Sequence, residues 1–186
     1  MALQIDFNRE KFKHLILLVA QESEDDPHFG ATKLNKILYF SDFKAFGILG
    51  APITGASYQR LERGPAPREM LPALRQMEAE GDIERAERRY FNLLQKRIKS
   101  LTSPDLSLFS PEELEIVKNV IAELTHMTAS QVSALSHLEI GWQATPPNEP
   151  ISYAMVYLSK SRPSTREVEE HRRIRFGDEA LGRVSG

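Results

Sequence analysis

The stretch TKLNKILYFSDFKAF, residues 32–46, decides the fold of this chain. Its apolar residues fall at positions that face nearly all round a helix axis rather than along one stripe. A helix of this kind has to be covered on several sides. The stretch therefore predicts a central helix from near Thr32 to about Phe46 that Gly47 and Gly50 stop, with Leu34, Ile37 and Leu38 buried in the core.

Further helices are expected on both sides of this stretch. Residues 9–22 repeat apolar side chains at the i, i+3, i+4, i+7 spacing, with Asn8 as a cap. Residues 110–113, Ser-Pro-Glu-Glu, combine a cap, a first-turn proline and a capping box. Thr128 and Gln131 repeat the capping-box pattern, and the apolar segment 151–158 is expected to be a last core helix.

Short β elements are expected between these helices. Residues 52–61 have the Ile, Thr and Tyr content of an extended segment. Residues 83–94 predict a hairpin that turns at 87–89. The fold class that follows is mainly α, a compact helical domain with a small β-hairpin or short strands inserted between helices.

A Gly-Pro-Ala-Pro joint, residues 64–67, separates the extended segment from the next helix. Pro67 suits the first turn of that helix, where a missing N–H has no consequence. The apolar stripe of the helix is expected to consist of Met70, Leu71, Leu74 and Met77. Two prolines fix the backbone firmly at this joint, and the function of that rigidity has to be explained.

Composition limits the classes of function. The chain has 186 residues and a formal net charge of −2, which suits one domain with an appendage and argues against binding nucleic acid through bulk charge. We expect a domain over residues 1–158 and a charged helical or flexible C-terminal appendage over 159–186. No cysteine, signal peptide or membrane-spanning segment is evident in the sequence, so we expect a cytoplasmic protein without membrane contact.

No catalytic or cofactor motif emerges. The five histidines do not have the spacing of a metal site, and there is no phosphate-binding loop or nucleophile elbow. We predict no catalytic residues, no metal and no cofactor, and hence no enzyme. The neighbours Ser136 and His137 leave an enzyme that uses His137 as a remote alternative.

A second alternative is a winged-helix-like, DNA-binding transcriptional regulator. Basic residues gather around the predicted hairpin, and such residues on a wing contact phosphates. The competing explanation is that a half-exposed hairpin protects its edges with charge, and acids at 82, 84 and 87 dilute the patch. The basic residues are Arg85, Arg88, Arg89, Lys96, Arg97 and Lys99.

Three motifs in order resemble a known family. TKLNKILYFSDF, ITGASYQRLERGPAPREM and ALSHLEIGWQATPPNEPISYAM are similar to the Panacea domain, the SocA-like antitoxin family that is also met in phage-associated proteins. The family pattern falls on Lys33–Phe40, Tyr58–Pro65 and Ser136–Trp142, and the resemblance covers about residues 10–158. Asn35 departs from the glutamine that is usual there.

The resemblance implies an antitoxin that neutralises a toxin encoded by a neighbouring gene through direct protein–protein binding, and it implies no catalysis. Some members are thought to deliver the toxin to an ATP-dependent protease, which would be a second partner. We expect the joint to hold the Tyr58 segment against the central helix. Tyr39 or Phe40 of that helix is expected to reach towards the Tyr58 segment.

Candidate partner-binding residues surround the joint. They are Tyr58, Arg60, Arg63, Arg68 and Trp142. Two alternatives stay open at this stage. The joint could serve only to close the core, and Trp142 could staple its proline-rich loop rather than anchor a partner.

Overall fold

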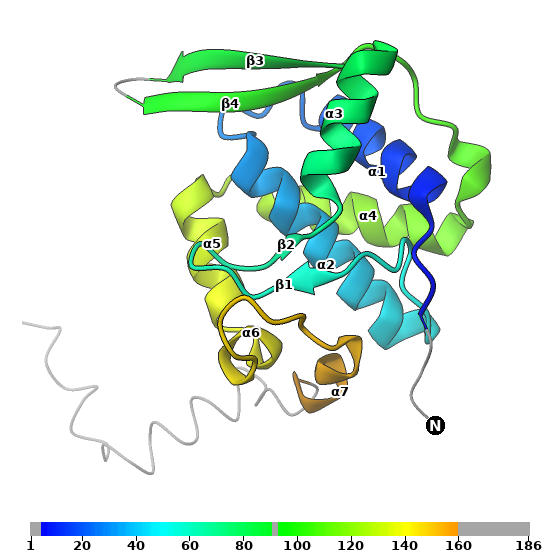
Figure 1. Cartoon of the computed structure of the whole chain (residues 1–186), viewed down its shortest axis with the longest axis vertical. Coiled ribbons are helices and arrows are strands. Elements are labelled where there is room, and N and C mark those ends of the chain that lie inside the picture. Colours follow the sequence, from blue (N-terminus) through cyan, green and yellow to red (C-terminus); the bar gives the residue numbers. More distant parts are fainter. Residues whose placement is uncertain (1–4, 91–92, 160–186) are drawn as a thin grey trace, which may run out of the picture.

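The computed structural model describes residues 5–90 and 93–159, and it confirms a mainly α fold with short strands between helices (Figure 1). Two separate two-stranded antiparallel sheets, β1–β2 and β3–β4, interrupt the helices. The expected appendage lies outside the described residues, apart from Ser159 at the end of the last helix. The elements are α1 (Arg9–Glu22), α2 (Ala31–Leu49), β1 (Tyr58–Gln59), β2 (Ala66–Pro67), α3 (Met70–Glu80), β3 (Ile83–Tyr90), β4 (Leu93–Ser100), η1 (Leu106–Leu108), α4 (Pro111–Leu124), α5 (Ala129–His137), α6 (Ile140–Ala144), η2 (Tyr153–Met155) and α7 (Val156–Ser159).

Helix α2 is the centre of the core, as its sequence predicts. It packs against α1, α4, α5 and α7 and against strands β2 and β4 (Figure 1). Leu34, Ile37 and Leu38 are all buried. The helix continues past the expected end near Phe46 to Leu49. Of the two glycines expected to stop it, Gly47 lies inside the helix, and Gly50 caps it with a φ of 81°.

The reason for Gly47 is close packing rather than helix termination. A Cβ atom at this position would stand 2.6 Å from Cγ2 of Val156. The missing side chain therefore lets α7 lie directly on the last turns of α2.

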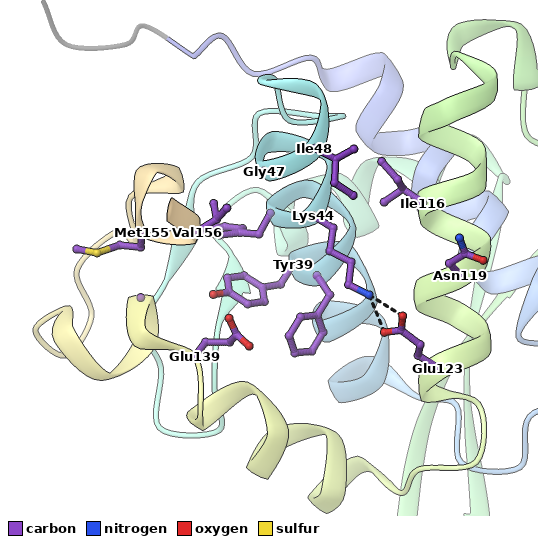
Figure 2. Close-up of a pocket in the computed structure, with 13 residues that line it drawn as sticks. Tyr39, Lys44, Gly47, Ile48, Ile116, Asn119, Glu123, Glu139, Met155 and Val156 are labelled. Carbon is purple, nitrogen blue, oxygen red and sulfur yellow. Dashed lines mark hydrogen bonds and ion pairs between the residues drawn. The ribbon is translucent and has the colours of Figure 1, made fainter. Parts of the chain in front are cut away.

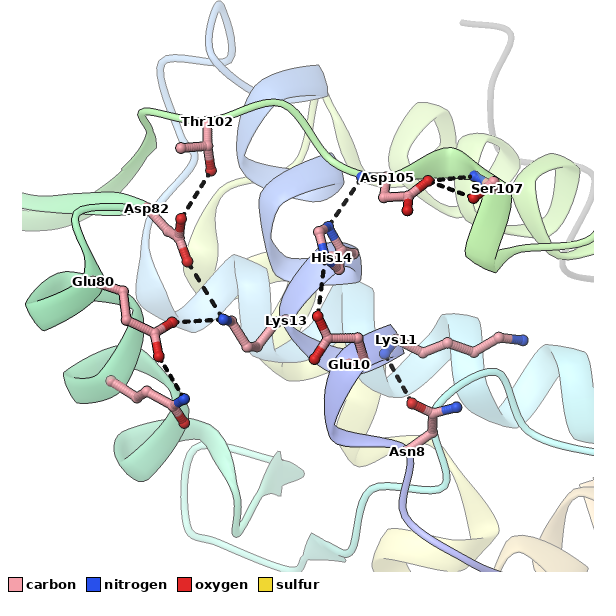
Figure 3. Close-up of polar contacts among 11 residues, drawn as sticks. Asn8, Glu10, Lys11, Lys13, His14, Glu80, Asp82, Thr102, Asp105 and Ser107 are labelled. Carbon is pink, nitrogen blue, oxygen red and sulfur yellow. Dashed lines mark hydrogen bonds and ion pairs between the residues drawn. The ribbon is translucent and has the colours of Figure 1, made fainter.

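Helix α1 is fastened by polar contacts at its exposed side (Figure 3). The Asn8 side chain accepts a hydrogen bond from the Lys11 N–H at 3.0 Å, which confirms the predicted cap. Lys13 pairs with Glu80 of α3 at 2.6 Å, and Nδ1 of His14 accepts the N–H of Asp105 at 3.0 Å. These contacts connect α1 to α3 and to the segment before α4.

Both predicted capping boxes form. Ser110 and Glu113 exchange side-chain to backbone hydrogen bonds at the start of α4. Thr128 and Gln131 do the same at the start of α5. Each box satisfies N–H groups that have no partner inside the helix, so the two helices begin at the residues that the sequence indicates.

Three expectations about the middle of the chain were wrong. Pro67 belongs to β2, and α3 begins only at Met70. Leu71 is 61% exposed, because only the Met70, Leu74 and Met77 side of α3 faces the core. The hairpin does not turn at residues 87–89, which pair along β3; Tyr90 lies opposite Leu93, and the turn lies outside the described residues.

Strand pairing explains the longer hairpin. Ile83 and Ile98 are both buried, and the register that pairs Ile83 with Ser100 and Arg85 with Ile98 places them on the same face. Because side chains alternate along a strand, this apolar pair fixes the register. The hairpin then packs on α1 and α3 through that face.

Polar side chains of α2 are buried together with the apolar ones and hold the surrounding loops. The ammonium of Lys33 binds the Asp26 carboxylate and the carbonyls of Thr125 and Met127, the latter two at 2.9 Å. Three partners compensate for the removal of this charge from water. Lys33 thus joins the loop before α2 to the loop between α4 and α5.

Asp42 performs the same task for the segment before β1. Its carboxylate accepts hydrogen bonds from the N–H of Thr54 at 2.7 Å, the hydroxyl of Thr54 at 2.5 Å and the hydroxyl of Tyr58 at 2.7 Å. Burial raises the pKa of Asp42, while these hydrogen bonds act in the opposite direction. The satisfied carboxylate orients the chain that leads into the joint.

A candidate partner-binding surface around Trp142

The joint, residues 64–67, ends the loop that connects β1 to β2 and includes β2 itself, and both ends of this loop are held. The strands pair antiparallel with Tyr58 opposite Pro67. A segment after α6 runs along β1: the N–H of Arg60 donates to the Glu149 carbonyl at 2.9 Å, and the N–H of Ile151 donates to the Tyr58 carbonyl at 2.7 Å. β1 therefore has neighbours on both sides, and the loop from residue 60 to residue 65 projects from a fixed base.

Gly64 is the point at which the three motifs meet. It has a φ of 90°, which favours glycine, and a Cβ atom there would stand 2.3 Å from Oγ of Ser136 and 2.7 Å from Cε of Lys36. Lys36 Nζ also donates to the carbonyl of Pro65 at 2.9 Å. One residue from each motif thus meets at a site with no room for a side chain at position 64.

Lys36 places a cationic group beneath this loop. The side chain is buried, and burial lowers its pKa from 10.5 to about 8. Lys33, one turn earlier, has a carboxylate partner, whereas the hydrogen bond found for Lys36 goes to a neutral carbonyl. Lys36 therefore holds the joint, but burying its positive charge destabilises the folded state. This destabilisation depends on pH because it disappears when the amine loses its proton.

Tyr58 lies inside the molecule, so its expected place in a partner-binding surface needs correction. Its side chain is 1% exposed, and its hydroxyl is bound to Asp42. Its ring meets Tyr39 with centroids 5.5 Å apart and Phe43 with centroids 5.7 Å apart, both edge to face. The contact from Tyr39 is the one expected for the central helix, and Tyr58 belongs to the core that supports the joint.

Trp142 fastens the tip of the loop. Its indole N–H donates to the carbonyl of Leu61 at 3.0 Å. The guanidinium carbon of Arg60 lies 4.5 Å from the indole centroid, and the His137 ring stacks on the same indole at 4.1 Å and 24°. Trp142 lies on the short helix α6 rather than in the expected loop. It is bonded to the loop of residues 60–65 rather than to the proline-rich loop that it was expected to staple, and it remains partly exposed.

His137 is the member of this stack that sequence reasoning missed. The sequence placed it at the end of a helix, which is correct, but assigned it no contact with Trp142. The two residues lie on different helices, since α5 ends at His137 and α6 begins at Ile140, with Leu138 and Glu139 between them. No periodic pattern crosses such a break, so no spacing rule could have paired the rings.

We call the loop tip and the indole beneath it the tip surface: Arg60, Leu61, Arg63 and Trp142, of which Arg60 and Trp142 are half-buried. Arg63 is exposed, and Leu61 is exposed although it is apolar. Arg68 is also exposed but lies at the other end of the β1–β2 pair, where its N–H donates to the Ser57 carbonyl at 2.9 Å. The structure thus brings three of the five predicted site residues to one place.

Two nitrogen atoms of the stack are buried without a hydrogen-bond partner among the described residues, Nε of Arg60 and Nε2 of His137. Buried polar groups are normally paired. Both lie on side chains that flank Trp142, and both are buried beneath the tip surface rather than presented on it.

The arrangement offers no support for catalysis at Ser136. Its hydroxyl donates to the Ser133 carbonyl at 2.7 Å, and the side chain is buried beneath Gly64. Across residues 5–90 and 93–159, no cluster of histidine, aspartate and glutamate side chains has the arrangement of a metal site. Over the same residues, no helix combines the length and the apolar character that crossing a bilayer needs.

Several basic residues of the β3–β4 hairpin are engaged within the protein. Nε of Arg85 donates to the Glu78 carboxylate at 2.9 Å, and Nη2 of Arg97 donates to the Glu24 carbonyl at 2.8 Å. Lys96 and Lys99 are exposed. Of these charges only that of Arg85 is compensated by a carboxylate, because the acceptor of Arg97 is a neutral carbonyl.

Comparison with known proteins agrees with the motifs that meet at Gly64. No curated protein and no solved structure gave a match. The sequence does match the family described as antitoxin SocA-like, Panacea domain, over residues 34–143, which is more than half of the 186 residues. That range includes α2 from Leu34 onward, the joint, and α6 up to one residue past Trp142. The chain belongs to the SocA-like antitoxin family and carries its Panacea domain.

Proposed function

We propose that this protein is the antitoxin of a toxin–antitoxin pair and that it neutralises its toxin by direct binding through the tip surface. The observation that carries the proposal is the rigid support of that surface. Arg60, Leu61 and Trp142 are joined by a hydrogen bond and a cation–π contact, while Gly64 locks the loop on α2 and α5.

Rigidity matters because a partner pays less conformational entropy when it binds a surface that is already ordered. Tryptophan and arginine are also the residue types that dominate binding energy at protein interfaces. A partner that offers carboxylates or backbone carbonyls would meet Arg60 and Arg63. The partner's contact surface is therefore expected to be acidic, with an apolar patch against Leu61.

The test uses the protein encoded by the neighbouring gene as the toxin. Arg63→Glu and Trp142→Ala should each weaken its capture by at least about tenfold, the range of hot-spot losses, and should abolish rescue of growth in co-expression. Arg9→Glu is a matched control because Arg9 is also exposed but is the first residue of α1, on another part of the molecule. Full rescue by both tip variants would contradict the proposal.

The same co-expression decides between blocking the toxin and delivering it to an ATP-dependent protease. We expect toxin levels to fall faster in the presence of the wild-type chain if delivery operates, and to stay constant if binding alone neutralises. We also propose that the pair acts in the cytoplasm, which the absence of cysteine from all 186 residues supports.

A further inference from the structure

The outer strand of the β3–β4 hairpin has one open edge. Among the residues that the structure describes, these two strands form a sheet with no third member. The edge of β4 is covered, because α1 and α2 pack against it and a Cβ atom on Gly30 would stand 3.2 Å from the carbonyl oxygen of Lys96. β3 lies on the outer side of the hairpin, away from α2 (Figure 1), and its residues 84–87 are all exposed.

The hydrogen-bond pattern shows which backbone groups point out from this edge. In an antiparallel pair, residues that exchange hydrogen bonds alternate with residues whose N–H and C=O point away from the partner strand. The N–H of Leu101 donates to the carbonyl of Asp82 at 2.8 Å, so this pair, just outside the strands, is of the exchanging kind. Along the register of β3, the even-numbered residues therefore bond to β4. The odd-numbered residues direct their N–H and C=O groups to the open edge, which can template a further strand.

The charges of β3 are complementary to those of a second β3 that runs in the opposite direction. Residues 84–88 read Glu-Arg-Ala-Glu-Arg. An antiparallel pairing centred on Ala86 sets Arg85 opposite Glu87 of the second copy. It also sets Glu84 opposite Arg88 of the second copy. Each of these pairs occurs twice by two-fold symmetry, and opposite charges that face each other across strands are stabilising.

Neighbouring registers lack this complementarity. Pairing centred on Arg85 or on Glu87 sets that residue opposite its own copy, which brings like charges together. Pairing centred between two residues sets odd-numbered positions opposite even-numbered ones, whose backbone groups already bond to β4. Centring on Ala86 joins odd with odd and places the smallest side chain of the strand at the axis. The strand therefore specifies one register for pairing with itself.

Arg85 already has one carboxylate partner in its own chain. Its Nε donates to the Glu78 carboxylate at 2.9 Å, and its Nη2 contacts the same oxygen. A guanidinium carries five N–H donors, and this side chain is 42% exposed, so a second carboxylate can bind without displacing Glu78. Glu87 is exposed and lies opposite Lys96 within its own hairpin. In the paired sheet each such glutamate would lie between two basic residues.

We propose that this protein forms a two-fold symmetric dimer in which β3 pairs antiparallel with β3 of a second copy, centred on Ala86. The two hairpins then form one four-stranded sheet in the order β4–β3–β3–β4. Residues 83–89 of each copy take part, so the interface belongs to the small, reversible class and the dimer dissociates on dilution. The inference does not rest on the proposed function, because it uses no residue of the tip surface.

The competing surface for self-association is the pocket beside α6. This hollow of about 430 Å³ lies between α2, α4, α6 and α7, and its walls, which include Phe43 and Ile116, are mostly apolar (Figure 2). Ile48 lines it and is 68% exposed, and exposed apolar patches mark contact sites. None of the residues that line this pocket belongs to the hairpin. Variants at the two places therefore separate the two modes of dimerisation.

Sedimentation equilibrium of the full chain over a range of concentrations tests the charge pairs. Glu87→Arg should raise the dimer dissociation constant at least about tenfold, because like charges then face each other at two symmetric places. Arg85→Glu should do the same with the opposite sign. Mixing the two variants should restore dimerisation, since a heterodimer again has opposite charges at both places. This rescue separates pairing from any effect of the substitutions on folding.

Two controls complete the series. Glu115→Arg makes the same change of charge at an exposed residue of α4. Ile48→Asp introduces a charge at the pocket beside α6. Both variants should dimerise as the wild-type chain does.

Amide hydrogen exchange tests the register. As the protein concentration rises, the N–H groups of Arg85 and Glu87 should exchange more slowly, because they become bonded in the dimer. The N–H of Ala86 is directed to β4, so its exchange should not depend on concentration. This alternation between neighbouring residues distinguishes pairing at the β3 edge from association through side chains.

Several results would overturn the inference. They are a chain that stays monomeric up to millimolar concentration, normal dimerisation of Glu87→Arg, a mixture of the two charge variants that fails to dimerise, and a dimer that Ile48→Asp dissociates. Slow exchange at Arg85 and Glu87 that requires the toxin, in a chain that is monomeric alone, would also overturn it. That result would assign the edge to a strand of the toxin instead.

Discussion

The Oγ atom of Ser136 lies 2.3 Å from the position that a Cβ atom on Gly64 would occupy. This relationship joins the joint to α5, and Lys36 of α2 completes the contact from below. It explains why a rigid glycine–proline turn occurs at this place. The turn lets the backbone at Gly64 pack directly on α2 and α5. The tip surface includes the part of the loop that faces solvent.

Gly64→Ala tests this contact. The variant would combine an unfavourable φ with a collision, so the free energy of unfolding should fall by roughly 2–5 kcal/mol. Gly50→Ala is the matched control, because Gly50 has a φ of 81° with no atom within 4 Å of its added Cβ. It should lose only the conformational part, roughly 1–2 kcal/mol. Equal losses in urea denaturation would show that packing at Ser136 is unimportant.

The core assignment of Tyr58 leads to a second prediction. Leu38→Ala should lower the free energy of unfolding by about 2–5 kcal/mol, and Tyr58→Ala by about 3–5 kcal/mol, since both remove fully buried side chains. Tyr58→Phe isolates the hydroxyl bound to Asp42 and should cost about 1–2 kcal/mol. Thermal melting measures all three. A Tyr58→Ala variant that melts like the wild-type protein would place Tyr58 outside the core.

Lys36 gives stability a dependence on alkaline pH. Its pKa is about 8 in the folded protein and 10.5 in the unfolded chain. Between these values the unfolded chain binds more protons, so raising the pH from 8 to 10 should stabilise the folded state by about 2 kcal/mol. Above pH 10 the trend should reverse, because burial raises the pKa of Tyr58 and the unfolded chain then releases protons more readily.

Lys36→Met provides the control for this titration. Without the ammonium, the free energy of unfolding, measured by urea denaturation at each pH, should not rise between pH 8 and pH 10. It should fall slightly toward pH 10, because burial raises the pKa values of Tyr39, Tyr58 and Tyr153 and the unfolded chain then loses their protons first. A variant that still gains stability over that interval would assign the effect to another group.

The position of Arg68 allows a test of whether the binding surface is centred on the tip surface or lies closer to α3. It is exposed at the far end of the β1–β2 pair from Trp142, so Arg68→Glu should reduce toxin capture less than Arg63→Glu does. Both variants change charge equally, and neither side chain is buried. Calorimetric titration with the toxin measures the difference. A greater loss for Arg68→Glu would move the interface toward α3.

Much of the fold was predictable because local rules determine it. Capping boxes fixed the starts of α4 and α5, and the all-round apolar pattern of α2 indicated its central place. The errors arose where contacts between residues far apart in the sequence determine where a helix ends or a hairpin turns. Val156 accounts for Gly47 inside a helix. The register that places Ile83 and Ile98 on the same face of the hairpin moved the turn beyond residues 87–89.

The candidate site was predictable only in part for the same reason. The motif around Tyr58 drew attention to the right loop, but sequence cannot tell that the Tyr58 ring turns inward to Asp42 while Arg60 turns toward Trp142. The pocket beside α6 had no signal of its own. Its lining comes from helices far apart in the chain, and each contributes residues that look like ordinary core.

Trp142 is the single tryptophan of the chain, and it lies between a guanidinium group and an imidazole ring. Its fluorescence therefore reports on one place, the junction between the loop and α6. Any molecule that displaces Arg60 or changes the hydration of the indole will alter the emission spectrum. The unmodified protein thus contains its own optical probe, and the encounter with a toxin can be followed in real time without attaching a label.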